Sequence, residues 1–162
     1  MPDTSLLHNH SLTTSSPTAD KWLVLVSDDD EMVHVVTKLV LKNLSFEGKP
    51  VELMKAKSAA ETIEILQKRS DVAVLLLDVV METMTAGLDA VSVIREGLGN
   101  HDTRIIVRTG QAGYEDDSAV IREYDVNGFT RKEELRHEDL RDVVVLGLRA
   151  FRDIQAAKAS AK

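Results

Sequence analysis

Three short apolar runs without polar alternation constrain the fold of this chain most strongly. They are WLVLV (22–26), VAVLLL (72–77) and RIIV (104–107). Strands that are covered on both faces of a parallel sheet have this composition, because neither face meets water. Weaker strands are predicted at 50–56 and 128–130. The chain is therefore predicted to build a mostly parallel sheet that is buried on both sides.

Helical periodicity separates these runs, so strands and helices alternate along the chain. In the first helix, Val33, Val36 and Val40 recur on one face and are expected to be buried. Right-handed crossovers between parallel strands then predict a doubly wound α/β fold with a five-stranded parallel sheet flanked by five helices. The predicted helices are 30–43, 58–69, 86–98, 115–123 and 137–156.

The length and composition fit one folded domain with short unstructured ends. A chain of 162 residues with 43% hydrophobic residues can bury one core. Residues 1–20 are rich in Ser, Thr, Asn and His and are predicted to be a disordered leader. The folded domain is predicted at 21–156, and 157–162 are interpreted as a C-terminal tail or a truncated linker.

The charge and the missing residue types exclude several classes of function. The formal net charge is −7, which argues against a nucleic-acid-binding surface because phosphate contacts need an excess of Lys and Arg. There is no cysteine, so disulfides and thiolate metal sites are excluded. No apolar run is long enough to span a membrane, and the first residues do not resemble a signal peptide. We expect a cytoplasmic protein.

Polar residues follow each strong strand. The first strand runs into Ser27 and a run of three aspartates at 28–30, the next strong strand into Asp78, and the following one into Thr109. Lys132 comes after the weak strand at 128–130. The carboxyl ends of strands in an open α/β sheet lie at one edge, where such folds bind their ligands. These side chains are therefore predicted to converge on one site.

The residue types at this edge predict a chemistry. Asp28 and Asp29 with Asp78 would supply the hard oxygen ligands that Mg²⁺ prefers. A cation and the Lys132 ammonium would offset the charge of an approaching phosphoryl group, so that Asp78 could act as a nucleophile toward phosphorus. The Thr109 hydroxyl could then donate a hydrogen bond to the phosphoryl group.

A simpler interpretation of the acidic run is a helix N-terminus. An Asp N-cap and acidic residues in the first turn stabilise a helix without any metal. Asp30 and Glu31 are assigned this role, while Asp28 and Asp29 are assigned to the metal.

The segments LVSDDDEM, LLLDVVM, RIIVRTGQ and GFTRKE together resemble the receiver domain of two-component response regulators, the flavodoxin-like phosphoacceptor family. The resemblance implies the strand order 2-1-3-4-5. It also implies that Asp28 and Asp29 hold Mg²⁺ and that Asp78 accepts a phosphoryl group from a histidine kinase or phosphotransfer protein. Thr109 and Lys132 would complete the site.

The resemblance implies further roles. The Val80 backbone carbonyl would be a metal ligand with Asp78, and Phe129 would be an aromatic switch residue alongside Thr109. The chain would be a signalling switch that assists its own phosphorylation and dephosphorylation, with its output domain absent. The face made of the fourth helix, fifth strand and fifth helix would switch partners and could form a homodimer.

The sequence departs from the family pattern at two places. Glu82 and Glu133 stand where the family usually has prolines, and Gly87 lies nine residues after Asp78, where the family has a glycine eight residues on. The loop after Asp78 is therefore predicted to be one residue longer and less rigid. The Lys132–Glu133 bond is either trans in a rebuilt loop or a strained cis bond.

A finer resemblance concerns METMTAGLDAV, IREGLGN, RTGQAG and YDVNGF, which are similar to receivers that precede HD-GYP phosphodiesterase domains acting on cyclic di-GMP.

Two other functions stay open on the sequence. One is a receiver-like module that no longer accepts phosphate and only binds partners. The other is a haloacid dehalogenase-type phosphatase, in which Asp28 would be the nucleophile and Asp30 the general acid. The phosphatase would need a second acidic pair after Lys132, and the segment EELRHEDLRD resembles the start of a helix instead.

Overall fold

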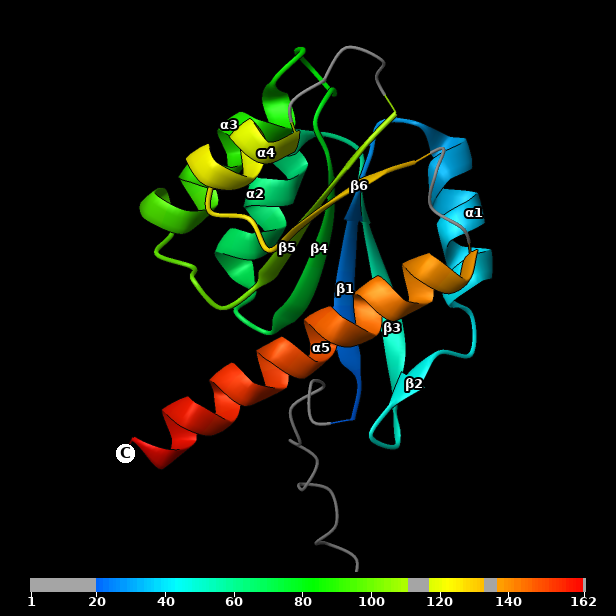
Figure 1. The fold of residues 1–162 in the computed structure, drawn as a ribbon, viewed down its shortest axis with the longest axis vertical. Helices are drawn as coiled ribbons and strands as arrows, with labels where there is room; N and C mark the ends of the chain where they lie inside the picture. Colours follow the sequence, from blue (N-terminus) through cyan, green and yellow to red (C-terminus); the bar gives the residue numbers. More distant parts are fainter. Residues whose placement is uncertain (1–19, 111–116, 133–136, 162) are drawn as a thin grey trace, which may run out of the picture.

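One sheet organises the molecule in the computed structural model, which describes residues 20–110, 117–132 and 137–161 (Figure 1). Its strands are β1 (Trp22–Ser27), β2 (Ser45–Phe46), β3 (Lys49–Ala56), β4 (Val72–Asp78), β5 (Arg104–Thr109) and β6 (Gly128–Arg131). They lie in the order β2-β3-β1-β4-β5-β6. All neighbouring pairs are parallel except β2 and β3. The predicted five parallel strands and their order are confirmed.

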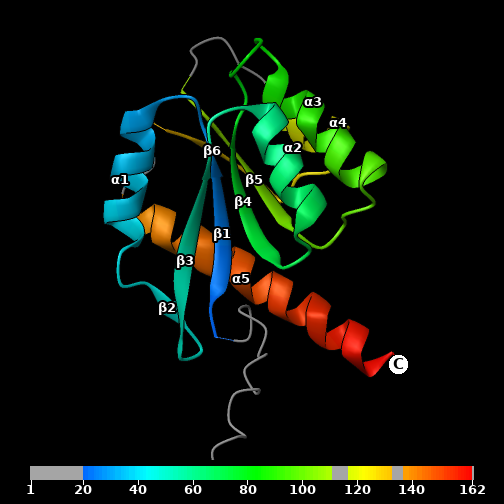
Figure 2. The same cartoon turned by 180° about the vertical axis from the view of Figure 1, so that it is seen from behind.

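Helices cover both faces of the sheet. They are α1 (Glu31–Leu41), α2 (Ala59–Lys68), α3 (Ala86–Ser92) with the π-helical turn η4 (Val93–Gly97), α4 (Asp117–Glu123) and α5 (His137–Ser160). Helices α2, α3 and α4 cover one face, and α1 and α5 cover the other (Figures 1 and 2). Each face has its own apolar core, and strands β1, β4 and β5 contribute alternate side chains to the two cores. Fully buried strands of this kind are what the unalternated apolar runs predicted.

Among the strands of the described residues, the short strand β2 is the one that the sequence did not predict. It forms a hairpin with β3 through Glu47 and Gly48, whose φ angles are 53° and 77°. Two central residues with positive φ make the turn that best matches the twist of paired strands, and such turns favour Gly at the second position. The Glu47-Gly48 dipeptide was therefore the available signal. Two residues of strand are too short to produce a periodic pattern.

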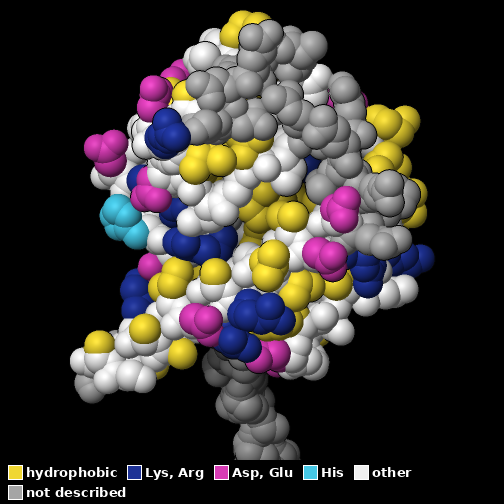
Figure 3. All heavy atoms as spheres, viewed as in Figure 1, with side chains coloured by type: hydrophobic (Ala, Val, Ile, Leu, Met, Phe, Trp, Pro, Cys, Tyr) yellow, Lys and Arg dark blue, Asp and Glu magenta, His cyan; other side chains and the backbone are white. Residues whose placement is uncertain are grey.

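Helix α5 is longer than predicted, because it continues to Ser160 instead of ending at 156. It crosses the sheet obliquely, and its C-terminal part extends beyond the edge of the domain (Figure 1). The crossing point needs a small residue: a Cβ added at Gly147 would lie 2.8 Å from the Val74 side chain. A pocket of about 370 Å³ lies between α5 and the strands β5 and β6. Apolar side chains are visible along this part of the surface in Figure 3.

Several predictions fall outside the described residues. The leader up to residue 19, the predicted start of the fourth helix at 115 and residue Glu133 are among them. Within the described helices, none has the length and apolar character required to cross a membrane.

Candidate functional site

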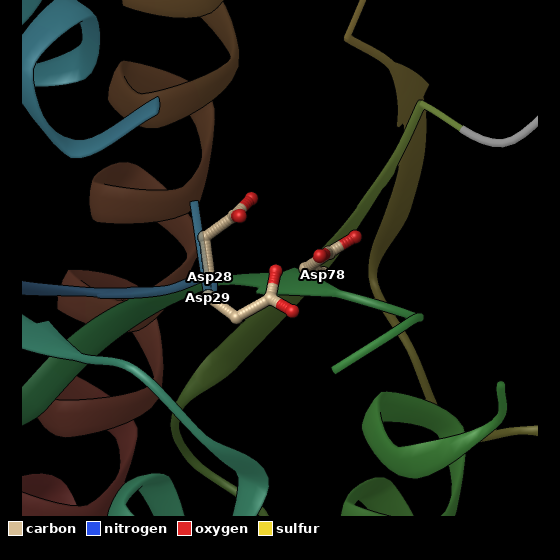
Figure 4. Close-up of side chains that lie close together, drawn as sticks. All are labelled: Asp28, Asp29 and Asp78. Carbon is tan, nitrogen blue, oxygen red and sulfur yellow. The ribbon is translucent and has the colours of Figure 1, made fainter. Parts of the chain in front are cut away.

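The carboxyl ends of β1 and β4 bring three aspartates together. Oxygen atoms of Asp28, Asp29 and Asp78 all lie within 4.8 Å of one another. Figure 4 shows the three side chains, two from the segment that follows β1 and one from the end of β4. Asp28 and Asp78 are buried, with 2% and 5% of their surface exposed, whereas Asp29 is exposed. The sequence predicted this cluster because neighbouring parallel strands end at the same edge.

Asp28 is held in place through its backbone and its side chain. Its backbone N–H donates to the Ala56 carbonyl at 3.1 Å, and its carbonyl accepts from His34 Nε2 at 2.8 Å. Its Oδ1 accepts from the Asp30 N–H at 2.9 Å, and its Oδ2 lies 2.5 Å from Lys132 Nζ. A carboxylate with this many fixed contacts is preorganised for a ligand.

The end of the acidic run has the structural role that was assigned to it. Asp30 is the N-cap of α1, and its Oδ1 accepts from the Met32 N–H at 2.9 Å. Glu31 lies in the first turn of α1 and pairs with Lys55 and Lys57. The four acidic residues from 28 to 31 therefore divide between a cluster and a helix terminus.

Lys132 reaches the cluster from the end of β6. Its ammonium group lies 2.5 Å from Asp28 Oδ2 and 3.4 Å from Asp78 Oδ1, and it thereby bridges the two buried carboxylates. Its backbone N–H donates to the Thr109 carbonyl at 2.9 Å. A Cβ added at Gly110 would lie 3.3 Å from the Lys132 side chain, so this glycine leaves room for the lysine. The Lys132–Glu133 bond lies outside the described residues.

Thr109 and Phe129 occupy the next two strands. Thr109 is the last residue of β5 and is 1% exposed, at the same edge of the sheet as the aspartates. Phe129 lies in β6, opposite Val107 in the strand register, and its partly buried ring packs against the core on the α2, α3 and α4 face. Val80 lies two residues after the end of β4 and is partly buried. The sheet thus places all the predicted residues at or near one edge.

Burial and like charge act together on Asp78. Burial and, next, the neighbouring charge of Asp28 raise the pKa of this carboxyl to about 6, against the opposing effect of Lys132. The negative charge of Asp78 is energetically unfavourable in this environment. Binding of a cation or covalent modification of the carboxylate would relieve this cost.

Helix α1 covers the site with polar residues, and the predicted buried face of this helix was partly wrong. His34, Thr37, Val40 and Leu41 are buried, whereas Val36 is 41% exposed. The difference is explained by the groups that α1 covers. At this end of the sheet the groups to be covered are polar, and they need hydrogen-bonding partners that valine cannot supply.

The partner of Thr37 is Arg108, a buried cation whose role the sequence did not predict. Arg108 is 8% exposed, and its Nη1 donates to Thr37 Oγ1 at 3.1 Å. Burial lowers the pKa of this guanidinium, and the charges of Asp28 and Asp78 oppose that effect. A second positive charge therefore lies behind the acidic cluster. An arginine directly after the apolar run at 104–107, beside Thr109, was the available signal.

The loop between β4 and α3 is closely fitted to the end of β4. The Gly87 N–H donates to the Val79 carbonyl at 2.8 Å, and a Cβ at Gly87 would lie 1.9 Å from the Asp78 carbonyl oxygen. Only glycine allows this approach. Glu82, which stands in place of the family's proline, accepts hydrogen bonds from the backbone of α2. The sequence predicted a less rigid loop and did not show these contacts, which connect the loop to α2.

The donor set of the cluster fits Mg²⁺. All three side chains offer carboxylate oxygens, the ligands that this hard cation prefers, and their spacing allows one ion to contact all three. A divalent cation would also balance the repulsion that raises the pKa of Asp78.

This fold and this arrangement at the carboxyl edge define a receiver. Residues 24–145 match the response regulator receiver domain family, and the chain belongs to that family. The predicted resemblance is therefore confirmed. The phosphatase alternative gains no support, since in the described part of the chain β6 is followed by helix α5 and not by a strand that ends in two acidic residues.

Among curated proteins, the chain is 44% identical over 135 residues to 3'3'-cGAMP-specific phosphodiesterase 2 of Vibrio cholerae. The match covers 83% of this chain but 26% of that relative, so the chain spans about a quarter of its length. A link to phosphodiesterases agrees with the finer resemblance in the sequence.

Solved structures share the fold. A CheY-like receiver domain protein from Methanospirillum hungatei is 22% identical with a TM-score of 0.66, and the match covers 83% of this chain and 98% of that one. A receiver domain protein from Clostridium thermocellum is 20% identical with a TM-score of 0.68, covering 82% and 98%. A structure described as adenylate cyclase from Rhodopirellula baltica is 19% identical with a TM-score of 0.70, covering 87% and 97%.

Proposed function

We propose that this chain is a phosphoacceptor switch in which Asp78 receives a phosphoryl group in a Mg²⁺-dependent reaction. The observation that carries the proposal is the convergence of the three carboxylates with the Lys132 ammonium at one edge of the sheet. Membership of the receiver family supports it. Of the aspartates, Asp78 is the best nucleophile because it lies at the centre of the sheet and its carboxylate carries the raised pKa.

The group transfer needs one nucleophile and one leaving group. An oxygen lone pair of Asp78 forms a bond to the phosphorus of a phosphohistidine, the P–N bond breaks, and its electron pair returns to the imidazole. The product is an acyl phosphate on Asp78 and a neutral histidine once the imidazole has taken up a proton.

The residues around Asp78 are suited to this step. Asp28, Asp29, Asp78 and the Val80 carbonyl would hold Mg²⁺, which supplies positive charge to the phosphoryl oxygens. Lys132 already lies between two of the carboxylates and is placed to pair with a phosphoryl oxygen. The buried Thr109 hydroxyl is placed to donate a hydrogen bond to the phosphoryl group and so to couple it to the backbone of β5.

The phosphodonor would be a histidine kinase or phosphotransfer protein, and the outer face of α1 suits its docking. Met32, Val36 and Leu39 are 63%, 41% and 67% exposed, and hydrophobic side chains gather over α1 at the right edge of Figure 3. This apolar face begins two residues after the N-cap Asp30 and is therefore continuous with the acidic site. A partner bound there would bring its phosphohistidine to Asp78.

The output would pass through the face formed by α4, β6 and α5. The two added negative charges would shift Thr109 and the backbone beside it, and Phe129 in β6 would follow. The pocket between α5 and β6 lies on this face and would accept a second copy of the chain in a homodimer. By analogy with the curated relative, the regulated activity would be that of a cyclic dinucleotide phosphodiesterase.

Intact mass spectrometry after treatment with acetyl phosphate tests the proposal. The wild-type protein should gain one phosphoryl group when Mg²⁺ is present and none when it is chelated. Asp78→Asn should gain none under either condition. Asp30→Asn is the matched control, because it makes the same change of charge close to the end of β1 and Asn can still cap α1. This variant should be phosphorylated like the wild type.

The same experiment distinguishes the phosphoacceptor switch from the remaining alternative function. A wild-type protein that stays unmodified at saturating donor and Mg²⁺ would indicate a receiver-like module that only binds partners. Modification that persists in Asp78→Asn would place the acceptor elsewhere.

A further inference from the structure

We propose that Glu82 is a positioning residue for Mg²⁺ at this site, an inference that rests on the proposed function. Its Oε1 accepts from the Ala59 N–H at 2.8 Å, and its Oε2 accepts from the Ala60 N–H at 3.1 Å. These two N–H groups are at the start of α2, where a helix has no internal acceptors for them. Both oxygens of one carboxylate therefore fasten the β4–α3 loop to a helix that lies far away in the sequence.

The contact is suited to fix the loop because it is bidentate and charged. Hydrogen bonds from backbone N–H groups to a carboxylate are stronger than those between neutral groups. The start of a helix also favours negative charge. These bonds lower the pKa of Glu82 although its side chain is partly desolvated. The carboxylate is therefore bound as an anion at the helix terminus.

Glu82 completes the anchoring of the segment that carries Val80. The residues on either side of Val80 are buried, with Val79 at 0% and Met81 at 9% exposure. The Met81 N–H also donates to the Thr83 carbonyl at 3.1 Å. Val80 thus lies on a short path between the end of β4 and the Glu82 anchor. A proline in place of Glu82 would limit the backbone conformation of this segment because its ring fixes φ. Glu82 limits it instead by hydrogen-bonding to the start of α2.

The same helix is connected to the other half of the site. Thr62 of α2 shares a buried hydrogen bond of 2.6 Å with Ser27, which directly precedes Asp28. Helix α2 therefore joins the segment after β4, through Glu82, to the end of β1, through Thr62. The ion would bind oxygens from both segments, so its affinity depends on how well their separation is fixed.

Glu61 provides a matched control because it acts on the same helix terminus without touching the loop. Its carboxylate accepts from the Lys57 N–H at 2.7 Å, and its own N–H donates to the N-cap Ser58. Replacing Glu61 weakens the start of α2 but leaves the link between Glu82 and the helix intact. If Glu82 only stabilised α2, the two replacements would have the same effect on Mg²⁺.

The experiment measures Mg²⁺ binding by isothermal titration calorimetry on wild type, Glu82→Ala, Glu82→Gln and Glu61→Ala, without any phosphodonor. We expect Glu82→Ala to raise the Mg²⁺ dissociation constant about tenfold, as loss of an outer partner of a metal site does. Glu82→Gln keeps one acceptor oxygen and should lie between Glu82→Ala and wild type. Glu61→Ala should stay within about twofold of wild type, because the loop keeps its anchor.

The phosphorylation readout separates the two proposals. With acetyl phosphate, Glu82→Ala should need about tenfold more Mg²⁺ for half-maximal modification and reach the wild-type extent at saturating Mg²⁺. Equal Mg²⁺ affinity in Glu82→Ala and wild type, or equal weakening in Glu82→Ala and Glu61→Ala, would overturn the role of Glu82. Unmodified wild type that still binds Mg²⁺ would overturn the phosphoacceptor function alone.

Discussion

Two buried arginines show how differently the two ends of the sheet are built. Arg95 lies in the π-helical turn η4, away from the acidic cluster, and is 3% exposed. Arg108 lies at the carboxyl edge of the sheet, behind the acidic cluster, and is 8% exposed. Burial lowers the pKa of both guanidinium groups, so both cations are held in an unfavourable environment. Their hydrogen bonds, however, are not alike.

Arg95 is fully engaged with the backbone around it. It donates to the carbonyl oxygens of Asn100, Thr103 and Asp125 and to Asn127 Oδ1, at distances from 2.8 to 3.0 Å. It thereby fixes the two loops that precede β5 and β6. Within the described residues, Arg108 donates from Nη1 to Thr37, and its buried Nε has no hydrogen-bond partner.

The difference in hydrogen bonding between the two arginines indicates that the two ends of the sheet have different roles. The end near Arg95 is built for stability, since each nitrogen of this buried guanidinium donates to an acceptor. The carboxyl edge keeps an incompletely bonded arginine beside two buried carboxylates and the lysine that bridges them. Unfavourable charge that persists in a folded protein is typical of a functional site. Three replacements test this comparison.

The largest effect is expected for Arg95→Met. The replacement keeps the apolar stem but leaves one buried and two partly buried carbonyl oxygens without the Arg95 donor. The free energy of unfolding should fall by about 3–5 kcal/mol. Urea denaturation followed by circular dichroism measures this change. Arg69→Met is the control, because Arg69 forms a partly exposed pair with Asp71 and should contribute less than about 1 kcal/mol. If Arg95→Met lowered the free energy of unfolding by less than about 1 kcal/mol, Arg95 would contribute no more than a partly exposed ion pair, and the comparison of the two ends would fail.

An effect of opposite sign is expected for Asp78→Asn. The folded-state pKa of about 6 lies above the ordinary value of 3.8, so the folded protein binds the proton more tightly than the unfolded chain does. Stability should therefore fall as pH rises from about 4 through 6, by up to about 3 kcal/mol. Asp78→Asn removes this loss and should be more stable than wild type at pH 7, but not at pH 4.

Urea denaturation at both pH values without Mg²⁺ checks this prediction. Asp30→Asn serves again as the control, because it makes the same charge change at a helix N-cap where Asn caps as well as Asp. Its stability should differ little from wild type at either pH. Added Mg²⁺ should stabilise wild type and narrow its difference from Asp78→Asn. A gain that is equal at pH 4 and pH 7 would disprove the role of the raised pKa.

The smallest effect is expected for Arg108→Met. Removing an incompletely bonded buried cation relieves its desolvation cost, and this gain offsets the lost attraction to Asp28 and Asp78. The free energy of unfolding should change by less than about 1 kcal/mol, in the same urea assay as for Arg95→Met. A loss as large as that of Arg95→Met would mean that both arginines are structural.

Much of the fold and of the candidate site could be predicted because both depend on regularities of the chain. Unalternated apolar runs identified β1, β4 and β5, and alternation with helices predicted the doubly wound fold. The order of the parallel strands followed from the resemblance to receivers. The polar residue after each strand then located the site, since parallel strands end at one edge. The convergence of Asp28, Asp78 and Lys132 followed from topology alone.

Other features could not be predicted because they depend on contacts between distant segments. The hairpin strand β2 is too short for a period, and the buried face of α1 depends on the polar groups beneath it. Arg108 and Thr37 are 71 positions apart in the chain, and nothing in either local sequence indicates the other.

Glu82 shows the division most clearly. The sequence determined that a glutamate replaces the family's proline, and by itself this predicted a less rigid loop. The tertiary structure decided that the carboxylate accepts from the two N–H groups at the start of α2 that have no acceptor within the helix. Local patterns fix which elements form and where their ends lie. The partner of a side chain at such an end depends on which distant backbone the fold brings within hydrogen-bonding distance.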